Sequence, residues 1–252
     1  MKKIDLNVDI GEGFPHDEEL LAFATSANIC CGEHAGSKEL TQQTVDLCAR
    51  KKIRVGAHPG YPDRENMGRR SMGVDQHRAY LDSIFEQMRW FVGITEPAYI
   101  KPHGAFYNDT AVPMPTSWEP YEGLLEPGVP FDPAGIFISN VPGAGSLGML
   151  LRVHKIELVG LAGTAHEMVA KRSGRRLIRE GFADRAYRKD GTLVPRSEDG
   201  AILKDPKSIK TQILALAPNV DTICLHGDTP GCVEFAEMVV ATLRDSGYRV
   251  AA

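Results

Sequence analysis

Four short apolar runs of this chain each end at a histidine that glycine or proline follows within two residues. Residues 53–63 are the clearest case, because a β-branched, apolar run stops at His58 inside a Gly/Pro cluster. Neither glycine nor proline extends a strand well, so each run is predicted to be a short buried strand with an imidazole at its end. The runs are residues 27–36 with His34, 53–63 with His58, 98–104 with His103, and 221–228 with His226.

Predicted strands alternate with predicted helices along the whole chain. Residues 3–10 alternate apolar and polar side chains with the period of a strand, whereas residues 75–91 carry an apolar face at helical spacing. This alternation favours one parallel α/β domain over residues 1–252. Further helices are predicted at residues 17–25, 37–51 (with Ser37 as N-cap), 146–154, 165–173, 205–217 and 231–246.

Two parallel architectures fit such an alternation. An open sheet gathers its site at one switch point, whereas a closed barrel collects groups from the carboxyl end of every strand. Nearly every predicted strand of this chain ends in an ionisable residue. We therefore predict a barrel of seven strands.

Residues 109–142 interrupt the alternation. They contain seven prolines, together with Trp118 and Tyr121, and show little periodicity. A loop of this length in a compact domain is usually a lid or an interaction element. We predict an ordered lid or interface flap, inserted into the barrel.

Composition excludes several classes of function. The net charge of −4 gives no basic footprint for nucleic acid, and no apolar run is long enough to cross a bilayer. The first residues lack the apolar core of a signal peptide. An odd number of cysteines without zinc-type CxxC spacing predicts reduced thiols in the cytoplasm. They are Cys30, Cys31, Cys48, Cys224 and Cys232.

The first predicted strand has an unusual polar face, formed by Asp5, Asn7 and Asp9. In a closed barrel these side chains point into the interior and need partners there. Ionisable residues of the other strand ends would then converge on the same mouth. The converging set is Asp5, Asn7, Asp9, Glu12, His34, His58, Asp63, Lys101, His103, Glu180, Asp184, His226 and Asp228.

Two kinds of chemistry fit this set. Imidazoles titrate near neutrality and pair with carboxylates that fix their tautomer, which suits general acid–base catalysis. Histidines with an aspartate also suit a divalent metal that activates water, and the candidate ligands are Asp9, His58 and His103. The sequence leaves both open. A serine nucleophile is disfavoured, because the chain has no GxSxG elbow.

Six motifs, in the same order along the chain, resemble those of the LamB/YcsF family. Together they span nearly the whole sequence, which makes the set far more specific than any one of them. They are residues 5–12 (DLNVDIGE), 26–36 (SANICCGEHAG), 55–63 (VGAHPGYPD), 101–108 (KPHGAFYN), 180–185 (EGFADR) and 226–231 (HGDTPG).

The resemblance implies a seven-stranded (β/α) barrel similar to the glycoside hydrolase/deacetylase barrels. It also implies a part in a 5-oxoprolinase, which opens the lactam of 5-oxoproline (pyroglutamate) to glutamate with ATP. B- and C-type subunits are the implied partners. This chain has no P-loop, which agrees with ATP being handled partly by those partners.

On this basis we predict that Asp9, His58 and His103 form the catalytic core, with His34 and His226 flanking it. Lys101 and Arg69 are the candidates for the substrate carboxylate or a transferred phosphate. The full set predicted to bind substrate is Asn7, Glu12, Asp63, Arg69, Lys101, Glu180, Asp184 and Asp228.

Two other functions stay open at the level of sequence. A metal-dependent deacetylase or amidohydrolase acting alone would contain stoichiometric divalent metal and would work without ATP. A non-catalytic subunit would bind a carbohydrate or lactam without turning it over. A homo-oligomer is compatible with each of these functions.

Overall fold

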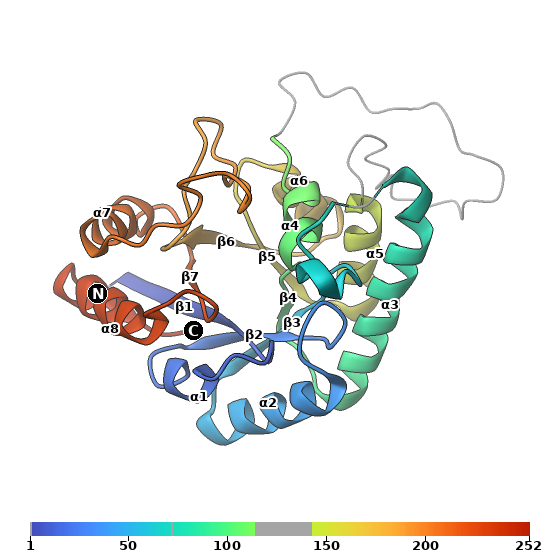
Figure 1. Cartoon of the computed structure of the whole chain (residues 1–252), viewed down its shortest axis with the longest axis horizontal. Helices are drawn as coiled ribbons and strands as arrows, with labels where there is room; N and C mark the ends of the chain where they lie inside the picture. The colour runs from blue at the N-terminus through green and yellow to red at the C-terminus, as the bar shows by residue number, and fades with distance from the viewer. Residues whose placement is uncertain (1, 72, 114–142) are drawn as a thin grey trace.

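The computed structural model describes residues 2–71, 73–113 and 143–252. Seven parallel strands close into a barrel, because β1 pairs with β7 on one side and with β2 on the other (Figure 1). The predicted seven-stranded (β/α) barrel is confirmed. The strands are β1 (Lys2–Ile10), β2 (Ser26–Cys30), β3 (Arg54–His58), β4 (Tyr99–Ile100), β5 (Glu157–Gly160), β6 (Leu177–Phe182) and β7 (Thr222–His226), with a short additional strand, β8 (Tyr248–Val250).

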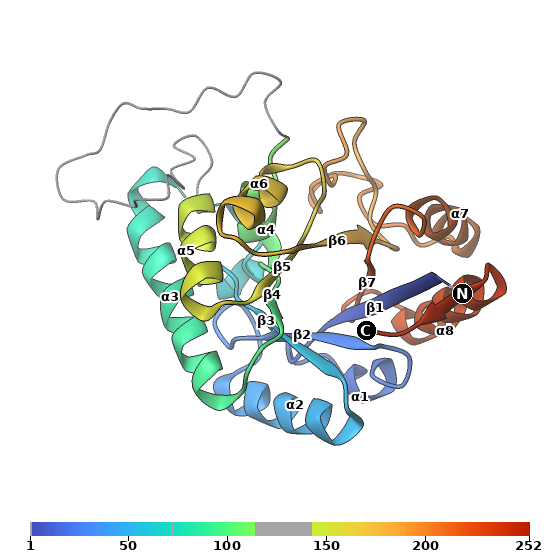
Figure 2. The ribbon, with the colours of Figure 1, turned by 180° about the vertical axis from the view of Figure 1, so that it is seen from behind.

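Helices lie around the outside of the ring of strands (Figures 1 and 2). Each predicted helix is present, although the one predicted at residues 17–25 ends at Leu20, because the chain turns there to enter β2. The helices are α1 (Asp17–Leu20), α2 (Lys38–Lys51), α3 (His77–Ile94), α4 (Gly104–Thr110), α5 (Ala144–His154), α6 (Ala165–Arg172), α7 (Pro206–Leu216) and α8 (Cys232–Asp245).

The two faces of β1 meet different environments. Its apolar side chains belong to the core between strands and helices, and they are Ile4, Leu6, Val8 and Ile10. Asp5, Asn7 and Asp9 on its other side are buried too, as their position inside a closed barrel requires. The Asp5 carboxylate, for example, accepts hydrogen bonds from the hydroxyls of Thr25, Ser26 and Thr222 at 2.5, 2.8 and 2.6 Å.

Strand register brings the carboxyl ends of β1, β2 and β7 to one level. Asp9 of β1 lies opposite Asn28 of β2 and opposite His226 of β7. Residues opposite each other in parallel strands point to the same side of the sheet. These three side chains are therefore directed toward the same end of the barrel interior.

The interior below this level is filled by side chains. A Cβ at Gly56 would lie 2.0 Å from the ring of Tyr99, so the glycine makes room for this tyrosine. The Tyr99 hydroxyl donates a hydrogen bond to Asn28 Oδ1 at 2.8 Å. The barrel is thus a packed core with its polar groups near the top.

The two ends of the chain lie side by side. β8 pairs in parallel with residues Lys2 to Ile4 of β1, outside the seven-stranded ring. Residues 114–142 lie outside the described residues, so the predicted lid or flap stays a prediction over nearly all of its length. No described helix has both the length and the apolar character needed to cross a membrane.

Candidate active site

A cavity of about 610 Å³ opens at the carboxyl ends of the strands. This volume is typical of pockets that take small molecules. Residues from several strand ends line it, including Asp9, His58, Lys101, His103 and His226. The wall also contains Arg69, Arg185 and Arg196, which come from the loops above the barrel.

A buried ion pair lies at the floor of the cavity. Lys101 is only 2% exposed. Its Nζ lies 2.8 Å from Asp9 Oδ1, 2.9 Å from Glu180 Oε1 and 3.0 Å from Cys224 Sγ. Burial raises the pKa of Asp9, but Lys101 and then His58 lower it, and the balance leaves it well below the usual range. Asp9 is therefore a carboxylate, and the three donors of Lys101 are used inside the protein.

His58 and His103 face each other through one ring nitrogen each. His58 Nδ1 donates to the carbonyl of Lys101 at 2.8 Å, and His103 Nε2 donates to the carbonyl of Met67 at 2.8 Å. In neutral rings these bonds leave a lone pair on His58 Nε2 and on His103 Nδ1. The two nitrogens are 2.9 Å apart, so a proton or a metal ion is needed between them.

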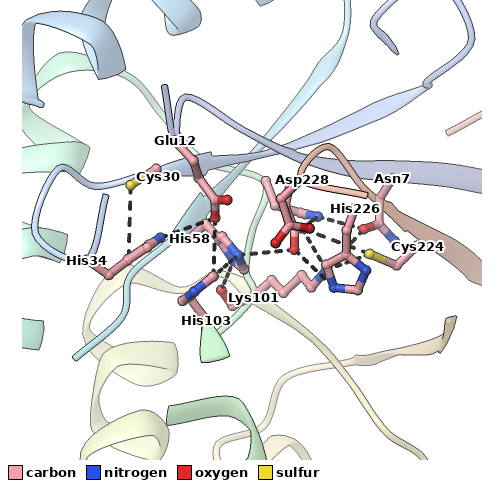
Figure 3. Close-up of polar contacts among 12 residues, drawn as sticks. Asn7, Glu12, Cys30, His34, His58, Lys101, His103, Cys224, His226 and Asp228 are labelled. Atoms are coloured by element: carbon pink, nitrogen blue, oxygen red, sulfur yellow. Dashed lines mark hydrogen bonds and ion pairs between the residues drawn. The ribbon is translucent and has the colours of Figure 1, made fainter. Parts of the chain in front are cut away.

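Glu12 and His34 complete this cluster (Figure 3). Glu12 Oε1 lies 3.3 Å from His34 Nε2 and 3.3 Å from His103 Nδ1, and the rings of His34 and His103 stack at 3.8 Å. Burial lowers the pKa of His34, but the Cys30 sulfur and Glu12 raise it to about 10. For His103, burial and then His34 and His58 hold the pKa well below the usual value. A charged and a neutral imidazole therefore lie in contact.

His226 approaches the same centre from the opposite side. Its Nδ1 donates to the Asp184 carboxylate, at 2.9 and 3.1 Å from the two oxygens. This bond fixes the tautomer and leaves a lone pair on His226 Nε2, which lies 3.7 Å from Asp9 Oδ2. The Phe182 ring stacks on the imidazole with the ring centroids 5.6 Å apart, which helps to fix the orientation of the imidazole ring.

Two groups of side chains in the described part of the chain have the spacing of metal ligands. Glu12, His34, His58 and His103 each offer one ligand atom, and these atoms lie within 4.8 Å of one another. Asp9 falls in a second group, with Cys224 and His226. A divalent cation fits the first group, because His58 Nε2 and His103 Nδ1 face each other beside Glu12; binding through His34 would release the proton of that ring. The carboxylate of this group is Glu12, whereas the predicted ligand Asp9 belongs to the second group, so its role as a metal ligand stays a prediction.

The predicted residues divide into those at the centre and those around it. The four strand-end histidines converge on Asp9 and Glu12 (Figure 3). Asn7 and Glu180 lie below, against Lys101, and Asp184 lies behind His226. Asp228 faces the loops, where Arg69 and Arg196 bind it.

Asp63 lies apart from this centre. It is not among the residues that line the cavity, and its Oδ1 accepts a hydrogen bond from Asn66. Conversely, four residues at the site were not predicted from the sequence, namely Asn28, Cys224, Arg185 and Arg196. The strand pattern was a usable signal for Asn28, which shares the inward side with Asp9. Arg185 belongs to the quoted motif at residues 180–185, whereas no local pattern marks Arg196.

The order of the motifs and this geometry agree with the family that the sequence matches. The model of the LamB/YcsF family matches residues 4–116 and 148–252. The chain belongs to the LamB/YcsF family. Most of the proline-rich segment predicted to be an insertion falls in the gap between the two matched stretches.

Curated LamB/YcsF relatives match this chain over nearly its full length. It is 34% identical over 271 residues to a Pyrococcus furiosus protein named as the A subunit of 5-oxoprolinase, with 98% of this chain and 96% of that protein covered. A Streptomyces avermitilis protein with the same name is 36% identical over 273 residues, with 99% of each chain covered.

Solved structures give the same picture for the fold of this LamB/YcsF protein. The lactam utilization protein from Thermus thermophilus superposes with a TM-score of 0.73 and 27% identity, and 99% of each chain is covered. A family 4 carbohydrate esterase from Streptomyces lividans has a TM-score of 0.50 and 10% identity, with 100% of this chain and 92% of that one covered. The second likeness concerns the fold alone.

Proposed function

We propose that this protein is the A subunit of a 5-oxoprolinase, which hydrolyses the lactam of 5-oxoproline to glutamate at the expense of ATP. One observation carries the proposal. A chain that matches 5-oxoprolinase A subunits from end to end buries a histidine–carboxylate cluster at the floor of a cavity large enough for a small molecule.

The reaction needs both a base and an acid. A lactam carbonyl is a poor electrophile, so ATP would transfer its terminal phosphoryl group to the lactam oxygen. Water then adds to the ring carbon, and the bond from that carbon to nitrogen breaks to give an acyl phosphate. A second water hydrolyses this acyl phosphate to the carboxylate and phosphate. In the ring-opening step the water loses one proton to the base, and the ring nitrogen gains one proton from the acid.

His226 is suited to act as the base. Its Nδ1 proton is held by Asp184, and its Nε2 lone pair faces the cavity beside Asp9. The imidazolium formed after proton transfer would lie between two carboxylates, which stabilises its charge. Asp9 itself is a weak base, because its pKa is held low, and it serves as a fixed negative charge.

The pair of His58 and His103 is suited to deliver the proton to the ring nitrogen. Both residues line the cavity, and a proton shared by their facing nitrogens can be donated to the ring nitrogen, with Glu12 and Asp9 close by. Lys101, whose donors are used by buried partners, holds Asp9 in place instead of binding substrate.

A divalent cation is the second occupant that fits the facing lone pairs. Glu12, His34, His58 and His103 would hold it, and it would supply Lewis acidity toward a carbonyl or a bound water. Elemental analysis of gently purified protein tests this. About one divalent ion per chain, together with activity in the absence of ATP and partners, would favour the alternative function of a metal-dependent amidohydrolase.

We further propose that B- and C-type subunits bind this chain and handle ATP with it. The chain lacks a P-loop, the sequence motif that commonly binds the phosphates of ATP. We also propose a cytoplasmic location, because all five cysteines are buried free thiols, as expected of a reducing compartment.

The proposal is tested by co-producing this chain with its B- and C-type partners and measuring glutamate released from 5-oxoproline. Release should require ATP and should fall by at least about 100-fold in His58→Ala and in His103→Ala. His16→Ala is a matched control, since this histidine is exposed and pairs only with Glu19 among the described residues. Turnover close to wild type in both cavity variants would refute the assignment.

A further inference from the structure

Beside the exposed Arg70, three buried or half-buried arginines line the loop side of the cavity, and the mechanism above uses none of them. Arg69 lies in the loop after β3, Arg185 follows β6, and Arg196 lies in the long loop before α7. All three line the same cavity as His58 and His226. Asp228 accepts hydrogen bonds from Arg69 and, at 2.9 Å, from Arg196, and so holds two of the guanidinium groups together.

Arg185 is the member of this cluster with unused capacity. It is only 5% exposed, and one of its terminal nitrogens donates to the carbonyl of Val194 at 2.7 Å. Its buried Nε has no hydrogen-bond partner among the described residues. Burying an unpaired donor of a cation is costly unless a ligand satisfies it. The geometry therefore indicates an oxygen ligand at this point.

The charges around Arg185 also favour an anionic ligand. Burial, and then the neighbouring charges of Arg196 and Arg69, lower the pKa of Arg185 to about 10, against an opposing effect of Asp184. Arg70 lines the same cavity, so its arginines outnumber the nearby carboxylates of Asp228 and Asp184. A carboxylate ligand would offset part of this excess of positive charge.

The surroundings fit a small ring that carries such a carboxylate. Phe182 and Leu193 are buried, line the cavity beside the arginines and form an apolar wall. In 5-oxoproline, the carboxylate and the lactam carbonyl are on the two ring carbons that flank the nitrogen. An arginine fork on the carboxylate would therefore fix which way the lactam faces.

We propose that Arg69, Arg185 and Arg196 form a carboxylate-binding subsite that anchors the substrate and turns its lactam toward His58 and His226. This inference rests on the proposed function for the identity of the ligand. These arginines are positioning and specificity residues; they take no part in proton transfer. The subsite selects amino-acid lactams over lactams that lack a carboxylate.

The test pairs two substrates with two variants in the complex of this chain and its partners. The substrates are 5-oxoproline and 2-pyrrolidinone, the same lactam without the carboxylate. Arg185→Gln and Arg196→Gln should each raise KM for 5-oxoproline by about 10- to 100-fold. The same variants should change kcat/KM for 2-pyrrolidinone by less than about twofold, because that substrate has no group for the arginines to bind.

Controls separate this role from a structural one. Arg188 lies in the same loop, is exposed and pairs with Glu198. Arg188→Gln should therefore leave the kinetic constants for both substrates unchanged. Arg185→Lys should restore only part of the affinity, since lysine lacks the planar fork. Equal losses on both lactams, from misfolding or from contact with a phosphoryl group, would overturn the subsite.

Direct binding distinguishes failure of the subsite from failure of the proposed function. In calorimetric titration of the whole chain, wild type should bind 5-oxoproline at least about tenfold more tightly than Arg185→Gln does. That result supports the subsite even if the complex never releases glutamate. Equal affinity in the two proteins, or no binding by wild type, overturns the subsite even if turnover is observed.

Discussion

At the scale of single residues, the molecule depends on charges that are buried in pairs. Lys101 contacts Asp9, Glu180 and Cys224 and is the largest charged side chain fully inside the described barrel. A buried charge is tolerated only while its partner is present. The site and the stability of the barrel therefore share this one contact.

Replacing Lys101 should reveal that dependence. Lys101→Met leaves two buried carboxylates without their cation, so we expect a loss of about 3–5 kcal/mol in the free energy of unfolding, measured by urea denaturation. Lys51→Met is the control, because Lys51 pairs with exposed Glu18 at the surface and should cost less than about 1 kcal/mol. Similar losses in the two variants would contradict the dependence on a buried pair.

A second residue-scale prediction concerns His166, which is fully buried and is not among the residues that line the cavity. Its Nδ1 accepts from the backbone N–H of Leu161 at 3.2 Å, and its Nε2 pairs with the Thr110 hydroxyl at 2.8 Å. Burial lowers the pKa of His166 to about 3. In the unfolded chain the value is about 6.5, so the folded state binds this proton less tightly.

The sign of the pH effect follows. Stability from neutral His166 is complete above about pH 6.5 and is lost as pH falls toward 3, by a total on the order of 4 kcal/mol. His166→Asn keeps an acceptor for Leu161 but does not titrate, so its free energy of unfolding should fall less between pH 7 and 4. His16→Asn, at an exposed site, should retain the wild-type slope. Parallel slopes in all three proteins would refute the prediction.

At this scale, sequence reasoning succeeded where a repeating pattern showed which way a side chain points. The two-residue period of β1 predicted that Asp5, Asn7 and Asp9 face one buried side, as observed. Strand periodicity gives no such information for Arg185 and Arg196. They reach the cavity from a loop, and a loop has no repeating pattern. Asp63 follows His58 closely in sequence but does not line the cavity, and its role in substrate binding stays a prediction.

At the scale of elements, each active-site histidine depends on the turn that follows its strand. Gly104 succeeds His103 and begins α4 with φ of +56°, and a Cβ there would lie 2.5 Å from the carbonyl oxygen of Gly68. That carbonyl accepts from the backbone N–H of Ala105 at 2.9 Å. Turn and helix therefore set the position of the imidazole.

Gly104→Ala should displace His103 and lower kcat/KM for 5-oxoproline by about 10- to 100-fold, because small displacements of catalytic groups are costly. The matched control is Gly93→Ala in α3, where a Cβ meets no atom within 4 Å among the described residues. This control should keep full activity and gain about 0.5–1 kcal/mol of stability. Full activity in Gly104→Ala would contradict the role of the turn.

Two elements went unpredicted for physical reasons. α4 spans seven residues and begins at a glycine, so it has neither the length nor the capping residue that marks a helix. β8 has three residues, too few for a period to be seen. Ser37, by contrast, was predicted as the N-cap of α2 and accepts a hydrogen bond from the Leu40 N–H at 3.1 Å.

At the scale of the whole molecule, the pairing of the two chain ends and the cavity lie at opposite ends of the barrel. The cavity is at the carboxyl ends of the strands, whereas β8 pairs with residues Lys2 to Ile4 at the amino end of β1. Ending the chain after Gly247 should therefore lower the free energy of unfolding by on the order of 2 kcal/mol. Glutamate release per folded complex should stay unchanged; a large loss of turnover would show that the two ends are coupled.

The central claim is that the cavity end of this barrel, and only that end, carries out lactam hydrolysis. Its most direct test compares Asp9→Asn with Asp5→Asn in the complex with B- and C-type subunits, by ATP-dependent release of glutamate from 5-oxoproline. Both aspartates are buried on the same side of β1, but Asp9 lines the cavity, whereas Asp5 binds three hydroxyls below it. We predict a fall of at least about 100-fold for Asp9→Asn and activity within about threefold of wild type for Asp5→Asn. Equal activities in the two variants would contradict the claim.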